Sequence, residues 1–149
     1  MMRLFLAVDV DDETRAQCDE VKGALAGQLA AAAGTPHITW VRAESLHVTL
    51  RFLGAADAER LVQLQTALRN FRIVPFTLAW GTVGVFGGAR HPRVLWVAPA
   101  AGSDALGAVV TMLNAELASV ADPPERRPFR PHLTLGRVRD PGRGIDWAS

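Results

Sequence analysis

Two histidines, each followed two residues later by a threonine, are the residues of this chain best suited to acid–base chemistry. The pattern occurs once in each half of the chain, as His47-x-Thr49 and as His132-x-Thr134. Imidazole titrates near neutral pH, so two histidines can divide the roles of general acid and general base. Threonine hydroxyls can donate hydrogen bonds to a phosphate. The paired motif therefore predicts hydrolysis of a cyclic phosphate, with a bell-shaped dependence on pH.

Strand geometry explains how such a motif can build a site. Alternate side chains of a strand point to opposite faces, so His47 and Thr49 share one face and Val48 and Leu50 share the other. The second motif repeats this arrangement. If the two strands lie side by side, both histidines and both threonines converge on one cleft. One His-x-Thr alone is a weak signal, but two copies among only four histidines favour a functional interpretation.

The surrounding sequence predicts the elements that must position these residues. Apolar runs indicate strands, whereas apolar residues three or four apart indicate helices that begin near acidic residues or Ser103 and end before Gly or Pro. We expect an α+β fold of one domain over residues 1–149, two-lobed and pseudo-symmetric, with mostly antiparallel sheet, helices outside, and one motif in each lobe. The predicted strands are 4–8, 38–41, 46–52 (ended by Gly54), 76–86, 94–98 and 133–138, and the predicted helices are 11–33, 57–71 and 103–119.

Composition excludes several classes of protein. Hydrophobic residues make up 49% of the chain and charged residues 21%, which is typical of a globular protein. The net charge of +1 is too small to predict nucleic-acid binding by itself, so any such role needs local clusters of charge. The single cysteine, Cys18, fits a reducing compartment. His37 and His91 have no partners at metal-ligand spacing. We expect a cytoplasmic monomer with no metal and no membrane segment.

The residues around both motifs resemble the 2H phosphoesterase superfamily, in particular the RNA 2′,3′-cyclic phosphodiesterases once named 2′-5′ RNA ligases. The resemblance implies a fold whose sheets line a central cleft. It also implies metal-independent, cofactor-free hydrolysis of the 2′,3′-cyclic phosphate at an RNA end to a 2′-phosphomonoester. The matching stretches are Arg3–Ala7, Trp40–Leu46, His47–Gly54, Gly84–Phe86, Arg93–Trp96 and Arg127–Arg137.

The resemblance also implies roles for individual residues. His47 matches the general acid that protonates the leaving oxygen, and His132 matches the base that activates water. Thr49 and Thr134 match the hydroxyls that hold the phosphate. Further residues expected to bind substrate are Arg137 at the phosphate, Phe52 near the nucleotide, and Arg130 in a basic loop that could reach an RNA strand.

This chain departs from the family pattern in two ways. Simple alternation places Arg137 and Phe52 on the faces opposite to the histidines. A β-bulge at Gly136 would turn Arg137 toward them, and Phe52 could belong to the core instead. The family also continues with further strand after the second motif, whereas little beyond Arg139 has a strand pattern, which would leave an exposed sheet edge.

Three other functions are compatible with the motifs. Two are activities of the same enzyme class: a 2′-5′ RNA ligase or phosphodiesterase, and a hydrolase of small cyclic nucleotides. The third is a module that binds RNA ends without turnover, which the presence of both histidines and both threonines disfavours. Phe86 and Trp96 have two interpretations as well, as core residues or as platforms that stack a base.

Overall fold

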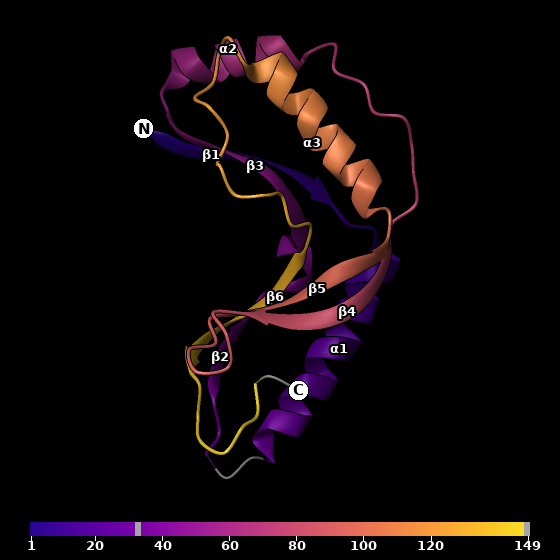
Figure 1. The fold of residues 1–149 in the computed structure, drawn as a ribbon, viewed down its shortest axis with the longest axis vertical. Helices are drawn as coiled ribbons and strands as arrows, with labels where there is room; N and C mark the ends of the chain where they lie inside the picture. The colour runs from indigo at the N-terminus through magenta and orange to yellow at the C-terminus, as the bar shows by residue number, and fades with distance from the viewer. Residues whose placement is uncertain (32–33, 148–149) are drawn as a thin grey trace. The chain divides into compact units, whose positions relative to one another are not determined.

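Six strands and three α-helices follow one another in the computed structural model, which describes residues 1–31 and 34–147 (Figure 1). The order of strands and helices confirms the predicted α+β class. In chain order the elements are β1 (Met2–Asp9), α1 (Asp12–Ala30), β2 (His37–Trp40), the short 3₁₀ helix η1 (Ala43–Ser45), β3 (His47–Ala56), α2 (Ala58–Leu68), β4 (Ala79–Phe86), β5 (Val94–Ala101), α3 (Ser103–Leu117) and β6 (Leu133–Asp140).

Two predicted element boundaries are wrong for local reasons. Gly54 does not end β3, because it adopts a positive φ of 77° within the strand, which continues to Ala56. Ser103 does not cap α3, because the N-cap is Gly102 with φ of 94°, and Ser103 is the first helical residue. The predicted end of the first helix at Ala33 falls outside the described residues, and α1 itself ends at Ala30.

The chain forms two compact units, each assembled from three separate segments. Unit 1 comprises Met1–Val8, Thr49–Trp80 and Pro99–Pro131, and unit 2 comprises Asp9–Val48, Gly81–Ala98 and His132–Ser149. The boundary passes through the first histidine motif, between Val48 and Thr49. The expected assignment of one motif to each lobe therefore stays a prediction.

In unit 1, α2 and α3 cover one face of β1 and β3. Leu53 of β3, Leu64 of α2 and Leu117 of α3 form a buried cluster, against which Leu4 and Leu6 of β1 pack. The inward residues of β1 alternate with exposed ones, as expected for a strand with one covered face. Burial of these leucines holds the helices on the sheet, at roughly 1.5–3 kcal/mol for each fully buried side chain.

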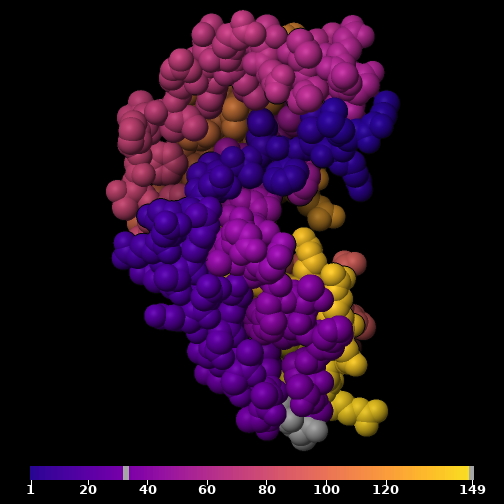
Figure 2. Space-filling view, turned by 180° about the vertical axis from the view of Figure 1, so that it is seen from behind, coloured from indigo at the N-terminus to yellow at the C-terminus, as the bar shows by residue number. Residues whose placement is uncertain are grey.

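In unit 2, β6 is the central strand of an antiparallel sheet. Its order is β3–β6–β5–β4, and β2 pairs with β6 along part of the edge that β3 leaves open. The segment of β2 lies along β6 in the space-filling view, where the violet and yellow atoms meet (Figure 2). Leucine and valine side chains fill the covered face, so both motif strands are anchored by apolar packing. The fully or nearly fully buried residues of this core are Cys18, Leu46, Val48, Leu95, Val97, Leu133 and Leu135.

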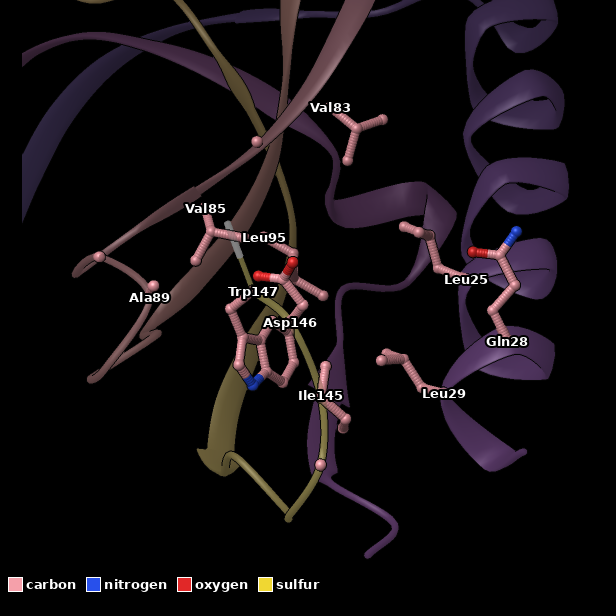
Figure 3. Close-up of a pocket in the computed structure, with 13 residues that line it drawn as sticks. Leu25, Gln28, Leu29, Val83, Val85, Ala89, Leu95, Ile145, Asp146 and Trp147 are labelled. Carbon is pink, nitrogen blue, oxygen red and sulfur yellow. The ribbon is translucent and has the colours of Figure 1, made fainter. Parts of the chain in front are cut away.

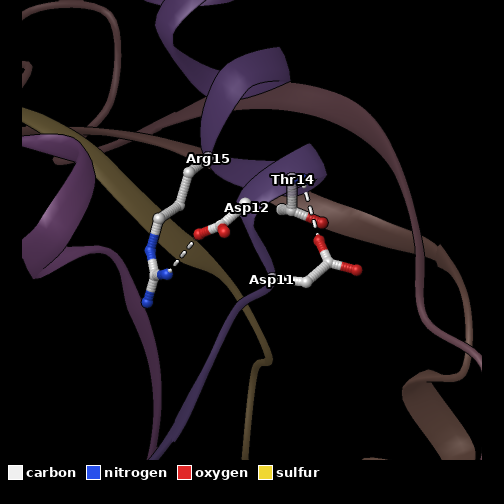
Figure 4. Close-up of polar contacts among 4 residues, drawn as sticks. All are labelled: Asp11, Asp12, Thr14 and Arg15. Atoms are coloured by element: carbon white, nitrogen blue, oxygen red, sulfur yellow. Dashed lines mark hydrogen bonds and ion pairs between the residues drawn. The ribbon is translucent and has the colours of Figure 1, made fainter.

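The start of α1 is capped by acidic residues, as the sequence predicted. The carboxylate of Asp11 accepts a hydrogen bond of 2.8 Å from the backbone N–H of Thr14, and Asp12 pairs with Arg15 at 3.1 Å (Figure 4). Hydrogen bonding from Thr14, through its side chain and then its backbone, lowers the pKa of Asp11. Within the described ranges, neither α1 nor any other helix combines the length and apolar character needed to cross a membrane.

Candidate active site

The two motif strands lie side by side in unit 2. Val48 of β3 is the antiparallel partner of Leu133 of β6, and both side chains are completely buried. Stepping one residue along each strand places His47 opposite Thr134, on the other face of the sheet. His47 and Thr134 are both half-buried. The sheet register thus brings an imidazole of one motif next to the hydroxyl of the other.

The orientation of His47 is fixed by its own turn. Its Nδ1 lies 2.8 Å from the carbonyl oxygen of Ser45, at the end of η1. A carbonyl oxygen can only accept, so Nδ1 carries a proton and donates it. The nitrogen that exchanges a proton with another group is therefore Nε2. This is the arrangement that a histidine needs in order to act repeatedly as an acid or base at one atom.

His132 is held by an aromatic contact. It directly precedes β6, and alternation places its side chain on the same face as Thr134. The Phe86 ring makes a T-shaped contact with the His132 ring, with centroids 4.9 Å apart. The rings of Phe86 and Trp96 are 5.1 Å apart in turn. Phe86 and Trp96 are both half-buried. They pack next to His132, which is neither of the two roles predicted for them, as core residues or as platforms for a base.

A β-bulge brings Arg137 onto the face of the histidines. Thr134 pairs with Trp96 and Arg137 pairs with Val94, so four residues of β6 oppose three of β5. Trp96 and Val94 share a face of β5, and residues directly opposite each other share a face of the sheet. Arg137 therefore shares the face of Thr134, as the proposed bulge at Gly136 requires.

Two features of the bulge explain why it is stable. The extra residue of β6 is Leu135, whose carbonyl accepts a hydrogen bond of 2.8 Å from the N–H of Val41. Its neighbour Gly136 is buried against Ile38 and Trp40, where an added Cβ would lie 2.8 Å from the Ile38 Cγ2 atom. Only glycine fits this position without displacing its neighbours. The backbone oxygen of Leu135 therefore keeps a hydrogen-bond donor, although Leu135 has no partner in β5.

Comparison with known proteins identifies the family. The LigT-like phosphoesterase model matches residues 14–96. An RNA 2′,3′-cyclic phosphodiesterase of Archaeoglobus fulgidus is 34% identical over 140 residues, which cover 93% of this chain and 73% of the relative. The chain belongs to the LigT-like phosphoesterase family. A relative of the same name from Thermotoga maritima is 33% identical over 140 residues, covering 93% of this chain and 71% of that protein.

Solved structures agree with the family assignment. The crystal structure of E. coli LigT complexed with 3′-AMP has a TM-score of 0.71 and 31% sequence identity, and the match covers 97% of this chain and 80% of that one. The crystal structure of TT0787 of Thermus thermophilus gives a TM-score of 0.67 at 31% identity, with 94% and 76% covered. The predicted resemblance to the 2H phosphoesterases and the predicted fold class are both confirmed.

The remaining predicted site residues of this LigT-like phosphoesterase lie in unit 1. Thr49 follows Val48 in β3 and is half-buried, and Arg130 is exposed near the end of its segment. Phe52 is 65% exposed, so the alternative that it belongs to the core is wrong. Its ring lies 6.2 Å from that of Phe5, which is 48% exposed. An exposed aromatic pair on the uncovered side of β1 and β3 is compatible with contact to a nucleotide.

A pocket of this LigT-like phosphoesterase lies on the other face of the unit 2 sheet. It has a volume of 610 Å³ and is lined by Leu25 and Leu29 of α1, by Val85 of β4 and Leu95 of β5, and by Trp147 of the C-terminal segment (Figure 3). Leu95 alternates with Trp96, so its side chain points away from the histidine face. This pocket is therefore separate from the predicted catalytic residues.

Other catalytic chemistries have little support in the described residues. Among them, no group of three or more His, Cys, Asp or Glu side chains is arranged to hold a metal ion. Cys18 is buried in the core, and burial raises the pKa of its thiol. A thiol with a raised pKa forms less thiolate and is a poorer nucleophile.

Replacing Gly84 with alanine tests the aromatic support of His132. A Cβ at Gly84 would overlap the Trp96 ring, so the indole that packs against Phe86 must move. We expect Gly84→Ala to lower the free energy of unfolding by about 1–3 kcal/mol, as for other overpacked sites, and to lower kcat. Gly107→Ala is the matched control, since nothing lies within 4 Å of its added Cβ. Equal stability of the two variants in thermal and chemical unfolding would contradict the prediction.

Proposed function

We propose that this protein is an RNA 2′,3′-cyclic phosphodiesterase that opens the cyclic phosphate at an RNA end to a 2′-phosphomonoester. The observation that carries the proposal is the register of β3 and β6, which sets His47 opposite Thr134 with His132 on the same face. The names of the relatives, which are RNA 2′,3′-cyclic phosphodiesterases, support the same activity. The reaction needs an acid, a base and donors to an anion, and these residue types supply all three.

The proposed reaction uses the two histidines in opposite protonation states. Neutral His132 removes a proton from water as the oxygen attacks phosphorus, and the bond from phosphorus to the ribose 3′ oxygen breaks. His47 gives its Nε2 proton to that oxygen, while its Nδ1–H remains bonded to the Ser45 carbonyl. The products are a 3′ hydroxyl and a 2′-phosphomonoester. To restore the starting state, His132 releases its proton to solvent and His47 takes up a proton from solvent.

Phosphate binding in this proposal falls to three further residues. The hydroxyls of Thr49 and Thr134 donate hydrogen bonds to the non-bridging oxygens, whose charge grows in the transition state. Arg137 adds a positive charge on the same face as Thr134. Phe52 and Arg130 contact the nucleotide and the RNA strand. We also propose that the enzyme acts as a monomer in the cytoplasm, where its lone cysteine stays reduced.

A turnover assay in excess chelator tests the proposed function. The substrates are an RNA oligonucleotide with a 2′,3′-cyclic end and a 2′,3′-cyclic mononucleotide, each incubated with and without chelator. We expect the same kcat in both conditions, because the histidines supply the acid and the base, and we expect a 2′-phosphate product. Loss of activity on chelation, with recovery on adding metal, would contradict the proposed mechanism. Binding of cyclic-ended RNA with no turnover would favour a module that only recognises RNA ends.

A further inference from the structure

We propose that the exposed face of β6 beyond the catalytic residues binds the phosphodiester backbone of the RNA strand on the 5′ side of its cyclic end. Arg139 is the central residue of this surface, and Thr39 of β2 positions it. The inference rests on the proposed function, because it concerns the strand attached to the reacting phosphate. It predicts that Arg139 makes the enzyme prefer RNA over a cyclic mononucleotide.

The bulge in β6 gives this surface its continuity. Arg137 shares the face of Thr134. Arg139 lies at a second irregularity of β6, between the pairs Val138–Ile38 and Asp140–His37, and its hydrogen bond to the Thr39 hydroxyl places its guanidinium on the face of Thr39. Arg137 is also opposite Thr39 of the neighbouring strand β2, so Thr39 faces the same side. The side chains of Arg137, Arg139 and Thr39 are all exposed. A row of basic and hydroxyl groups therefore runs along β6 from Thr134 toward the end of the strand.

A hydrogen bond holds Arg139 in this row. Its Nε donates to the Thr39 hydroxyl at 3.1 Å, which ties the guanidinium to the face of the sheet. The salt bridges found among the described residues do not involve Arg137 or Arg139. Among the residues that the structure describes, no carboxylate therefore forms a salt bridge with either guanidinium group. Pre-positioned arginine loses less entropy when it binds an anion than a freely rotating side chain does.

Spacing and chemistry identify the ligand as a nucleic-acid backbone. Residues two apart in a strand are separated by about 7 Å, at about 3.4 Å per residue. This separation is of the same order as that between successive phosphates of an extended strand, so Arg137 and Arg139 can each meet one. Guanidinium binds phosphate oxygens through two N–H groups at once. A cyclic mononucleotide has only the reacting phosphate and leaves Arg139 without a ligand.

Comparison of two substrates tests the proposal. The kcat/KM is measured for a cyclic-ended oligonucleotide of five residues and for the matching 2′,3′-cyclic mononucleotide, with the wild type and with Arg139→Gln, over a range of salt concentrations. For the oligonucleotide we expect Arg139→Gln to lower kcat/KM about tenfold, as for loss of one hydrogen bond to a charged group. We expect the slope of log kcat/KM against log salt to weaken by about 0.7, the value for one single-strand phosphate contact. The mononucleotide should be unaffected.

Two further variants separate this role from effects of charge or folding. Arg15→Gln removes the same charge from α1, and we expect it to leave the preference between the two substrates unchanged. Arg139→Lys keeps the charge and should restore most of the salt dependence. If Arg139→Gln lowers activity on both substrates equally, or on neither, the proposed RNA surface is wrong. If the wild type hydrolyses neither substrate, the proposed function itself is wrong, so the two failures can be told apart.

Discussion

Replacement of either motif histidine with alanine should lower kcat by at least about 10²–10⁴-fold, the usual contribution of one general acid or base. His47 has a geometry suited to a general acid. Its Nδ1 donates a hydrogen bond to the Ser45 carbonyl, so Nε2 is the nitrogen that can exchange a proton with the substrate. His132 lies on the same face of the unit 2 sheet, held by Phe86. Steady-state assays of His47→Ala and His132→Ala with a cyclic mononucleotide measure the effect directly.

The double variant distinguishes a catalytic pair from two independent contributors. If the histidines act as one unit, His47→Ala combined with His132→Ala should be little worse than either single change. The exposed His91 provides a matched control, since His91→Ala removes an imidazole from a loop outside the predicted site. Full multiplication of the two single effects, or full activity of either single variant, would contradict the paired mechanism.

The dependence of activity on pH provides a second test of the roles of His47 and His132. The base must be neutral, so activity should rise with pH as His132 loses its proton. The acid must be protonated, so activity should fall at higher pH as His47 loses its own. The wild-type profile should therefore be bell-shaped. Residual activity should lack the acidic limb in His132→Ala and the alkaline limb in His47→Ala, and the opposite pattern would exchange the two assigned roles.

Much of this site could be predicted from local patterns in the sequence. Alternation in His47–Leu50 and in the second motif predicts strands with one apolar face and one polar face, and the pairing of Val48 with Leu133 shows that the two strands are neighbours. The buried side chains of both motifs fall on the predicted face. Local patterns succeed here because burial of one face of a strand fixes its register.

Other features depend on tertiary contacts that no local pattern contains. Arg51 alternates with the half-buried Thr49 in β3, but its side chain is only 7% exposed. Its guanidinium donates to the backbone carbonyl of Asp122, and desolvation by burial lowers its pKa. Likewise, the contact of Phe86 with His132 joins residues far apart in the sequence. The sequence does show that Arg137 and Arg139 are two residues apart in a predicted strand. Which face of the sheet Arg137 occupies could be assigned only after the bulge in β6 was located.

Loss of the Thr134 hydroxyl should be the next most damaging change at the site. Thr134 lies opposite His47 on one side and Trp96 on the other, so its side chain has a defined position at the centre of the histidine face. A hydroxyl that donates to a non-bridging oxygen stabilises the charge that develops in the transition state. We expect Thr134→Val to lower kcat by about 10²–10³-fold, the typical effect of removing one such donor. Assays with the cyclic mononucleotide isolate this effect from binding of the RNA strand.

Matched variants decide whether the hydroxyl or the shape of the side chain matters. Valine has nearly the size of threonine and suits a strand, so Thr134→Val should leave the free energy of unfolding nearly unchanged. Thr134→Ser keeps the hydroxyl and should retain most of the activity, although it loses a methyl group. If serine and valine variants are equally impaired, packing rather than hydrogen bonding is what Thr134 supplies. If valine alone is impaired, the donor acts on the phosphate, and a larger change in kcat than in KM places that action in the transition state.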